Sequence, residues 1–195
     1  MRAALRFLTG LGVLALYGAG TAAAQRPQTR EGFWIGFGFG YGTADASCET
    51  ILGSPCGNSD RVGGVTGFVK LGGTLSPSVL VGGAVNAWTK EDQGVTETMG
   101  NVTASLFYYP APASGFFLTG GLGFSSYRLS NGGSIDGSGW GFTAGLGYDI
   151  RVGRNISLTP NVNFVYGGVG DIEGGAAATG WKQNVFDLGL GITFH

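Results

Sequence analysis

The sequence predicts an all-β protein, an eight-stranded antiparallel up-and-down transmembrane β-barrel. Three observations support this fold class. Charged residues are 12% of the chain, about half the usual share of roughly 25%. Beyond the N-terminal region no apolar run approaches the about 18 residues of a membrane helix. The C-terminal segment instead places a large apolar residue at every second position, which turns one face of a strand toward lipid: Phe186, Leu188, Leu190, Ile192 and Phe194.

The N-terminal 24 residues have the pattern of a secretory signal peptide. Arg2 and Arg6 give a basic start, residues 7–17 are apolar, and small residues precede Gln25. We therefore expect a signal peptide at 1–24, a periplasmic N-terminal segment at 25–31 and a barrel at 32–195. Removing the two arginines leaves nine basic and twelve acidic residues, a net charge of 9 − 12 = −3. That balance argues against a nucleic-acid partner.

A period-two template predicts the first four strands at 32–42, 62–75, 79–87 and 101–109. The first has large apolar residues at each odd position from Phe33 to Tyr41, whereas its other face carries Trp34 and then only glycine. The second alternates Val69 and Leu71 against Lys70. The third and fourth are shorter and are bounded by turn residues.

The same template predicts four more strands at 116–127, 139–151, 156–166 and 181–194. The sixth presents alternate apolar residues from Trp140 to Ile150. The seventh contains Pro160, which cannot donate a ladder hydrogen bond, so the sequence predicts a bulge or a later start there. The eighth is the C-terminal segment, and closure of the barrel places it beside the first.

Connection lengths and aromatic residues give the barrel a direction. Short turns are expected at 76–78, 110–115 and 152–155, and long outer loops at 43–61, 88–100, 128–138 and 167–180, in strict alternation. Aromatic residues are expected where the lipid-facing strands meet the two interfaces. The predicted topology places Tyr108, Phe116, Tyr148 and Phe194 at the periplasmic ends and Tyr41, Phe124, Trp140 and Tyr166 toward the outer ends.

A soluble eight-stranded barrel of the lipocalin kind is the main alternative fold. Such a barrel has apolar residues around its ligand and charged residues in water. Here the polar register is mostly Gly, Thr, Ser and Asn, whereas the few strand charges are expected to point inward. The sequence therefore favours the membrane barrel.

The interior is expected to be filled, with four charged groups inside it. Large side chains can pack over the bare glycine faces, which predicts a plugged lumen, although the many inward glycines leave a narrow pore for small solutes as an alternative. Lys70 and Asp187 are predicted to form an ion pair. Asp149 and Arg151, nearer the periplasmic mouth, are the alternative partners.

The chain resembles the small eight-stranded outer-membrane barrels of the outer-membrane protein A and X type. The resemblance covers residues 32–195 and rests on strand count, loop alternation and the terminal pattern from Phe186 to Phe194. It implies that the terminal pattern is the signal read by the barrel-assembly machinery. His195 departs from the family pattern, in which the chain ends on an aromatic residue, and no peptidoglycan-binding domain is expected.

Two further motifs have simpler interpretations than catalysis or metal binding. Cys48 and Cys56 lie in the first outer loop, where an oxidising compartment favours a disulfide, because two thiolates without a nearby His make an incomplete zinc site. The glycine run from Gly36 to Gly42 has no helix after it and is read as a strand, not a nucleotide-binding loop. No metal or cofactor is expected.

The sequence favours a non-enzymatic protein with a structural or surface-interaction role. The chain has one histidine, His195 at the periplasmic end, so a His-based lipid A hydrolase is disfavoured and a lipid A-modifying enzyme is the least favoured alternative. Expected surroundings are outer-membrane lipid and lipopolysaccharide, with a monomeric barrel and an unidentified extracellular ligand. The outer loops are acidic, which suits divalent cations or a basic partner, or simply keeps them solvated: Asp45, Glu49, Asp60, Glu91, Asp92, Glu97, Asp136, Asp171 and Glu173.

Overall fold

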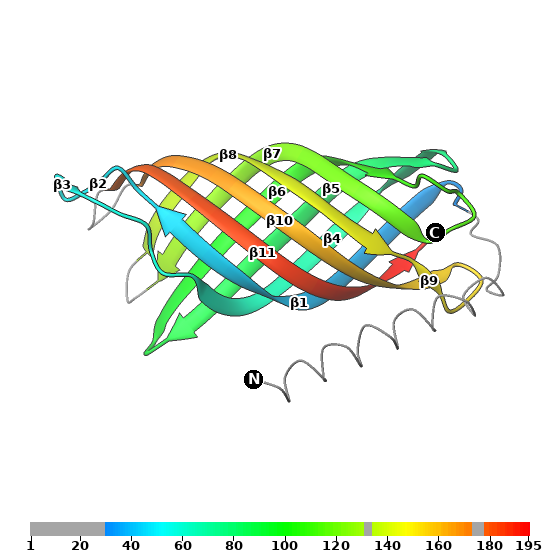
Figure 1. Ribbon diagram of the computed structural model, residues 1–195, viewed down its shortest axis with the longest axis horizontal. Helices are drawn as coiled ribbons and strands as arrows, with labels where there is room; N and C mark the ends of the chain where they lie inside the picture. Colours follow the sequence, from blue (N-terminus) through cyan, green and yellow to red (C-terminus); the bar gives the residue numbers. More distant parts are fainter. Residues whose placement is uncertain (1–29, 131–133, 173–177) are drawn as a thin grey trace, which may run out of the picture.

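The protein is a single closed antiparallel sheet (Figure 1). The computed structural model describes residues 30–130, 134–172 and 178–195. The predicted signal peptide, most of the predicted periplasmic segment and Glu173 lie outside the described residues. The strands are β1 Phe33–Ser47, β2 Thr50–Ile51, β3 Ser54–Pro55, β4 Val62–Ser76, β5 Val79–Asp92, β6 Val95–Tyr108, β7 Phe116–Ser130, β8 Ser134–Tyr148, β9 Ile150–Arg151, β10 Ile156–Ile172 and β11 Ala178–Phe194.

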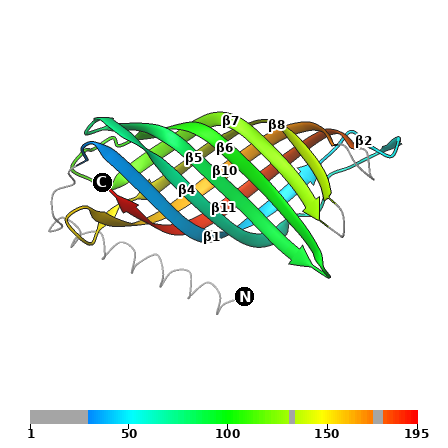
Figure 2. The same ribbon diagram turned by 180° about the vertical axis from the view of Figure 1, so that it is seen from behind.

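Eight long strands form the barrel wall, which confirms the predicted fold class. Each pairs with its sequence neighbour, and β11 closes the ring on β1, where Ile35 lies opposite Phe194 and Ser47 opposite Lys182. The two opposite views show all the strands tilted in the same sense around the axis (Figure 2). The described residues contain no helix that is long and apolar enough to cross a membrane.

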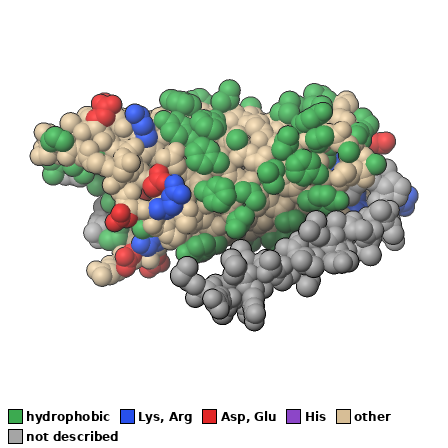
Figure 3. Space-filling view, viewed as in Figure 1, with side chains coloured by type: hydrophobic (Ala, Val, Ile, Leu, Met, Phe, Trp, Pro, Cys, Tyr) green, Lys and Arg blue, Asp and Glu red, His purple; other side chains and the backbone are tan. Residues whose placement is uncertain are grey.

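The outer wall carries an apolar belt nine residues tall. On β1, β7, β8 and β11 the outward apolar positions span 33–41, 116–124, 140–148 and 186–194. A membrane-spanning strand needs about 9 to 11 residues, so each belt segment matches one bilayer crossing. In the space-filling view hydrophobic side chains cover this wall, whereas most charged ones gather at the end that carries β2 and β3 (Figure 3). That end is the extracellular one in the predicted topology.

The predicted long outer loops are largely wrong, because the strands continue beyond the belt. The segments predicted as loops at 88–100, 128–138 and 167–180 lie mostly within β5 to β11. β5 and β6 meet in a two-residue turn, Gln93–Gly94, in which both residues have positive φ. This is the backbone geometry of a tight hairpin, and the sequence lacked the usual Asn-Gly or Asp-Gly signal for it.

A change of solvent along each strand explains why these extensions were missed. Above the belt the outward residues become polar, as in Thr43 and Asp45 on β1 or Ser126 and Arg128 on β7. The inward residues become apolar instead, and a cluster of them fills the barrel there. The alternation is therefore preserved but inverted, and the lipid-facing apolar pattern ends with the belt.

The predicted effect of Pro160 on β10 is also corrected. β10 begins at Ile156 and runs through Pro160 in unbroken register with β11, where Pro160 lies opposite Leu190. On its other side β10 pairs with β9 up to Leu158 and with β8 from Asn161 onward. The missing N–H therefore lies at the gap between β8 and β9, where no ladder bond is required.

The belt boundary can be tested on β7 with one arginine at two depths. Gly120 lies at the middle of the β7 belt, faces outward, and has open space around an added side chain. Gly120→Arg should lower the free energy of unfolding by about 2 to 4 kcal/mol, because its charge lies at the bilayer midplane. Ser126→Arg, above the belt, should cost less than about 1 kcal/mol.

Urea titration of the bilayer-inserted barrel measures both costs, and Gly120→Leu is the matched control for side-chain size. Equal losses for the two arginines would mean that the belt does not end at Phe124.

Candidate functional site

The candidate site is the lumen together with the extracellular end of the barrel. Its periplasmic mouth contains a cluster built on Asp149, which follows β8 and is fully buried. Tyr109 Oη and Thr159 Oγ1 donate to its two carboxylate oxygens, each at 2.8 Å. His195 Nε2 lies 3.3 Å and Arg30 Nη2 3.9 Å from Oδ2. We call these five residues the Asp149 hub.

The hub holds both ends of the described chain. Arg30 precedes β1, donates to the backbone oxygens of Pro112 and Ser114 at 2.9 Å, and stacks its guanidinium 3.6 Å from the centre of the Tyr109 ring. His195 follows β11, and its side chain is 1% exposed. Planar cation stacking and a shared carboxylate fix both segments against the β6–β7 connection.

The electrostatics of the hub favour an ionised Asp149. Burial by itself raises the pKa of this carboxyl, but the nearby His195 side chain and the positive charge of Lys70 outweigh it. The pKa is thereby lowered from 3.8 to about 2. The carboxylate is thus charged at any physiological pH.

Above the hub the lumen is filled by aromatic rings. Trp34, Leu80, Phe107, Tyr109 and Phe117 form one buried cluster, and Phe107 contacts both Trp34 and Phe117 edge-on. The glycine face of β1 makes room for β4 side chains, as the sequence predicted. A Cβ added to Gly38 would lie 2.7 Å from the Phe68 ring, and one added to Gly36 would lie 2.7 Å from Lys70 Cε.

The middle of the lumen is polar and contains Lys70 and Asp187, both buried. They are not within salt-bridge distance of each other. Through the ladder Lys70 aligns with Gly36 and Thr193, six residues from Asp187 along β11, or roughly 20 Å along the strand. Closure of a barrel staggers its strands, so inward residues at similar distances from their strand ends lie at different heights.

Each predicted interior charge has its own surroundings. Lys70 Nζ lies 4.8 Å from the centre of the Phe117 ring, and Asp187 Oδ1 accepts a hydrogen bond from Asn163 at 3.1 Å. Asp149 is in the hub. Arg151 is buried beside the periplasmic turn, where its Nη1 donates to the Arg154 carbonyl oxygen at 3.3 Å.

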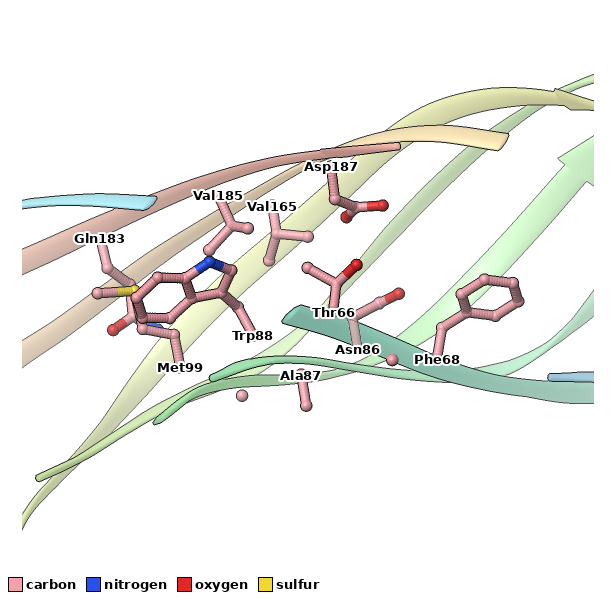
Figure 4. Close-up of a pocket in the computed structure, with 12 residues that line it drawn as sticks. Thr66, Phe68, Asn86, Ala87, Trp88, Met99, Val165, Gln183, Val185 and Asp187 are labelled. Carbon is pink, nitrogen blue, oxygen red and sulfur yellow. The ribbon is translucent and has the colours of Figure 1, made fainter. Parts of the chain in front are cut away.

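An apolar cluster closes the lumen at the extracellular side. Its members come from β1, β5, β6, β7, β10 and β11: Ala44, Ala46, Trp88, Met99, Tyr127, Val165, Val169, Ile172, Ala178 and Val185. Trp88 Nε1 donates to the Gly42 carbonyl oxygen at 3.1 Å. The cavity between this cluster and the polar layer, drawn in Figure 4 with Trp88, Met99 and Asp187 around it, is only about 10 Å³. That is room for one water molecule at most.

The extracellular end carries a stapled hairpin. Cys48 and Cys56 form the predicted disulfide across β2 and β3. Its Cα–Cα distance of 5.4 Å lies in the usual range. β2 extends the sheet by pairing with the outer end of β11, so the hairpin stands beyond the rim (Figure 1). Leu52 at its tip has positive φ and is 71% exposed.

Acidic residues surround this end, on strand extensions more than on loops. Among the described residues above the belt, eight are acidic and four are basic. Asp45 accepts hydrogen bonds from Arg61 and Asn184, and these outweigh burial, which raises its pKa, so that the pKa lies below its usual value. The described residues contain no group of three or more ligands suited to a metal ion.

The predicted assembly signal lies on the lipid-facing side of β11. Its five apolar residues are between 36% and 61% exposed and therefore form part of the belt. Sequence reasoning missed Arg30, Thr159 and Tyr109 as partners of Asp149. Thr159 could have been identified from its inward position in the alternation of β10. Arg30 lies before the first strand, where no alternation indicates which way a side chain points.

Removing the charge of Asp149 tests the hub. Asp149→Asn leaves buried cationic and hydroxyl partners without a carboxylate and should lower the free energy of unfolding at neutral pH by about 3 to 5 kcal/mol. Because the pKa of Asp149 is lower in the folded protein, its carboxylate stabilises the wild-type protein above pH 3.8. This stabilisation is lost as the pH falls toward about 2. Urea titrations across that window should converge for the two proteins. Asp136→Asn, on the exposed wall, should change little, and a loss of equal size there would contradict the role of the hub.

A double-mutant cycle tests whether Lys70 and Asp187 interact. Their separation predicts that Lys70→Met and Asp187→Leu change the free energy of unfolding additively, within about 0.5 kcal/mol. Urea titration of the bilayer-inserted barrel measures the free energy of unfolding of the wild type, the two single variants and the double variant. A double variant that recovers much of the single losses would support the ion pair expected from the sequence.

Comparison with known proteins places the chain in a family. Residues 12–194 match the family described as outer membrane protein beta-barrel domain. Neisserial surface protein A is similar in structure, with a TM-score of 0.54, 16% identity, and coverage of 85% of this chain and 98% of that one. No curated protein sequence matches the chain.

A second similar structure is that of Ail, the attachment invasion locus protein of Yersinia pestis, in complex with the heparin analogue sucrose octasulfate. The TM-score is 0.51 and the identity 14%, over 84% of this chain and 99% of that one. At sequence identities this low, the structural similarity shows a shared fold and nothing more. The match over nearly the whole sequence, on a closed eight-stranded wall with a lipid-facing belt, shows that the chain belongs to the outer-membrane β-barrel family and that its place is the bacterial outer membrane.

Proposed function

We propose that this protein is a closed, non-enzymatic barrel that presents an acidic, disulfide-stapled surface to a basic partner outside the cell. The observation that carries the proposal is the inverted polarity above the belt. There the wall is polar outside and apolar inside, as in a soluble protein, so the strands support a rigid platform beyond the lipid.

The filled lumen argues for binding at the surface rather than transport. The Asp149 hub and the aromatic cluster, which share Tyr109, fill the periplasmic part of the lumen, and the extracellular apolar cluster fills the opposite part. The lumenal cavities between them are about 10 and 30 Å³. A solute pore would need these clusters to move apart together.

Catalysis finds little support in the same arrangement. His195 is the single histidine, and it is buried against Asp149 at the periplasmic end. A substrate in the outer leaflet could not reach it. The charge of the extracellular end favours cationic partners, because an excess of carboxylates repels polyanions and attracts basic chains.

The test uses zwitterionic liposomes that carry the full barrel and measures binding to an immobilised poly-lysine peptide and to heparin. Wild-type liposomes should bind the basic peptide, with an affinity that falls as salt rises, and should not bind heparin. Neutralising Asp60, Glu91 and Asp92 as amides should weaken binding about tenfold. The matched control neutralises Glu31, on the periplasmic side. Undiminished binding by the amide variant would contradict the proposal.

The same preparation, fused into planar bilayers, tests whether the barrel is closed. Stable traces without unitary current are expected, and a steady open conductance would replace the proposal with the narrow pore that the sequence left open.

A further inference from the structure

The polar layer of the lumen contains a buried cation whose charge has no anion in contact with it. Lys70 is 7% exposed, and its ammonium faces three aromatic rings, those of Phe117, Phe107 and Phe68, with Nζ 4.8, 5.2 and 5.7 Å from the ring centres. Rings stabilise a cation but accept none of its three hydrogen bonds in the way that oxygen does. Within the described chain Lys70 Nζ has neither a hydrogen bond nor a salt bridge.

A cavity of about 30 Å³ lies beside this ammonium group. Its wall includes Asn86, whose buried Nδ2 has no hydrogen-bond partner, and the hydroxyl-bearing residues Ser105, Thr119 and Thr143. An unpartnered buried amide donor is costly, and so is an unpaired buried charge. Lys70 and Asn86 both line this cavity, and Asn86 also lines the neighbouring cavity drawn in Figure 4.

No carboxylate lines this cavity. Its wall has twelve residues, none of them Asp or Glu. Asp187 lines the neighbouring cavity, where it accepts a hydrogen bond from Asn163. Asp149, whose charge acts on Lys70, is held within the hub by its own donors. An acceptor in the cavity would satisfy the donors of Lys70 and Asn86, and negative charge there would be stabilised by the Lys70 ammonium group.

We propose that this cavity binds one small monovalent anion of the halide class, with Lys70 Nζ supplying the charge and Asn86 Nδ2 a hydrogen bond. The space is larger than the 10 to 15 Å³ that a single water requires, and it is too small for a carboxylate-bearing metabolite. Phe107 and Phe117 of the aromatic cluster form part of its wall.

The test is refolding of the full barrel in sodium bromide, chloride or gluconate at equal ionic strength. Crystals of the bromide form should give an anomalous bromine peak beside Lys70 Nζ. The urea midpoint should be higher in either halide than in gluconate, and the difference should grow with the logarithm of halide concentration.

Three variants make the result specific. Lys70→Met should lose both the peak and the halide dependence, whereas Lys182→Met, an equivalent change on the exposed wall, should keep both. Asn86→Leu retains the charge and should weaken the halide dependence, which covers the case in which Lys70→Met fails to fold. A solvent peak without anomalous signal, or a wild-type midpoint that ignores the choice of salt, would show that water alone fills the cavity and overturn the proposal.

Discussion

The structure depends on one constraint, that a backbone in hydrocarbon must find all its hydrogen bonds within the protein. Pairing of β11 with β1 satisfies it, because the sheet then has no open edge along the belt. Closure also fixes the stagger between strands, and the stagger decides which inward side chains meet. The separation of Lys70 from Asp187 and the convergence of Tyr109, Thr159 and Asp149 both follow from it.

A second constraint is the change of solvent along the same strands. Within the belt the outside must be apolar, so the inside carries what polarity the chain has, including Asn161, Asn163 and Asp187. Beyond the belt water wets the outside, and the inside becomes the hydrophobic core, with Trp88 and Met99 at its centre. One continuous sheet therefore combines a membrane protein with a small soluble-type barrel, and neither part needs a linker.

The belt was predictable from the sequence because lipid imposes a strict alternation, as from Phe186 to Phe194. The strand extensions were harder, since Thr43 and Asp45 outside and Ala44 and Ala46 inside give weak contrast in either register. The disulfide was predictable because Cys48 and Cys56 are close in sequence and lie in an exported chain. The Asp149 hub was not predictable, since it joins residues between 30 and 195 through a register that only the folded ladder defines.

The strand extensions above the belt also determine how far the rim of the barrel stands above the membrane. On β1, β7, β8 and β11 they contain between six and eight residues, at about 3.3 Å per residue and a tilt near 40°. The rim therefore stands roughly 15 to 20 Å above the hydrocarbon. At that height the stapled hairpin clears the headgroup layer, and a large macromolecule can reach it without displacing the surrounding lipids. Because the support is a closed sheet and not a flexible loop, little conformational freedom would be lost when a partner binds.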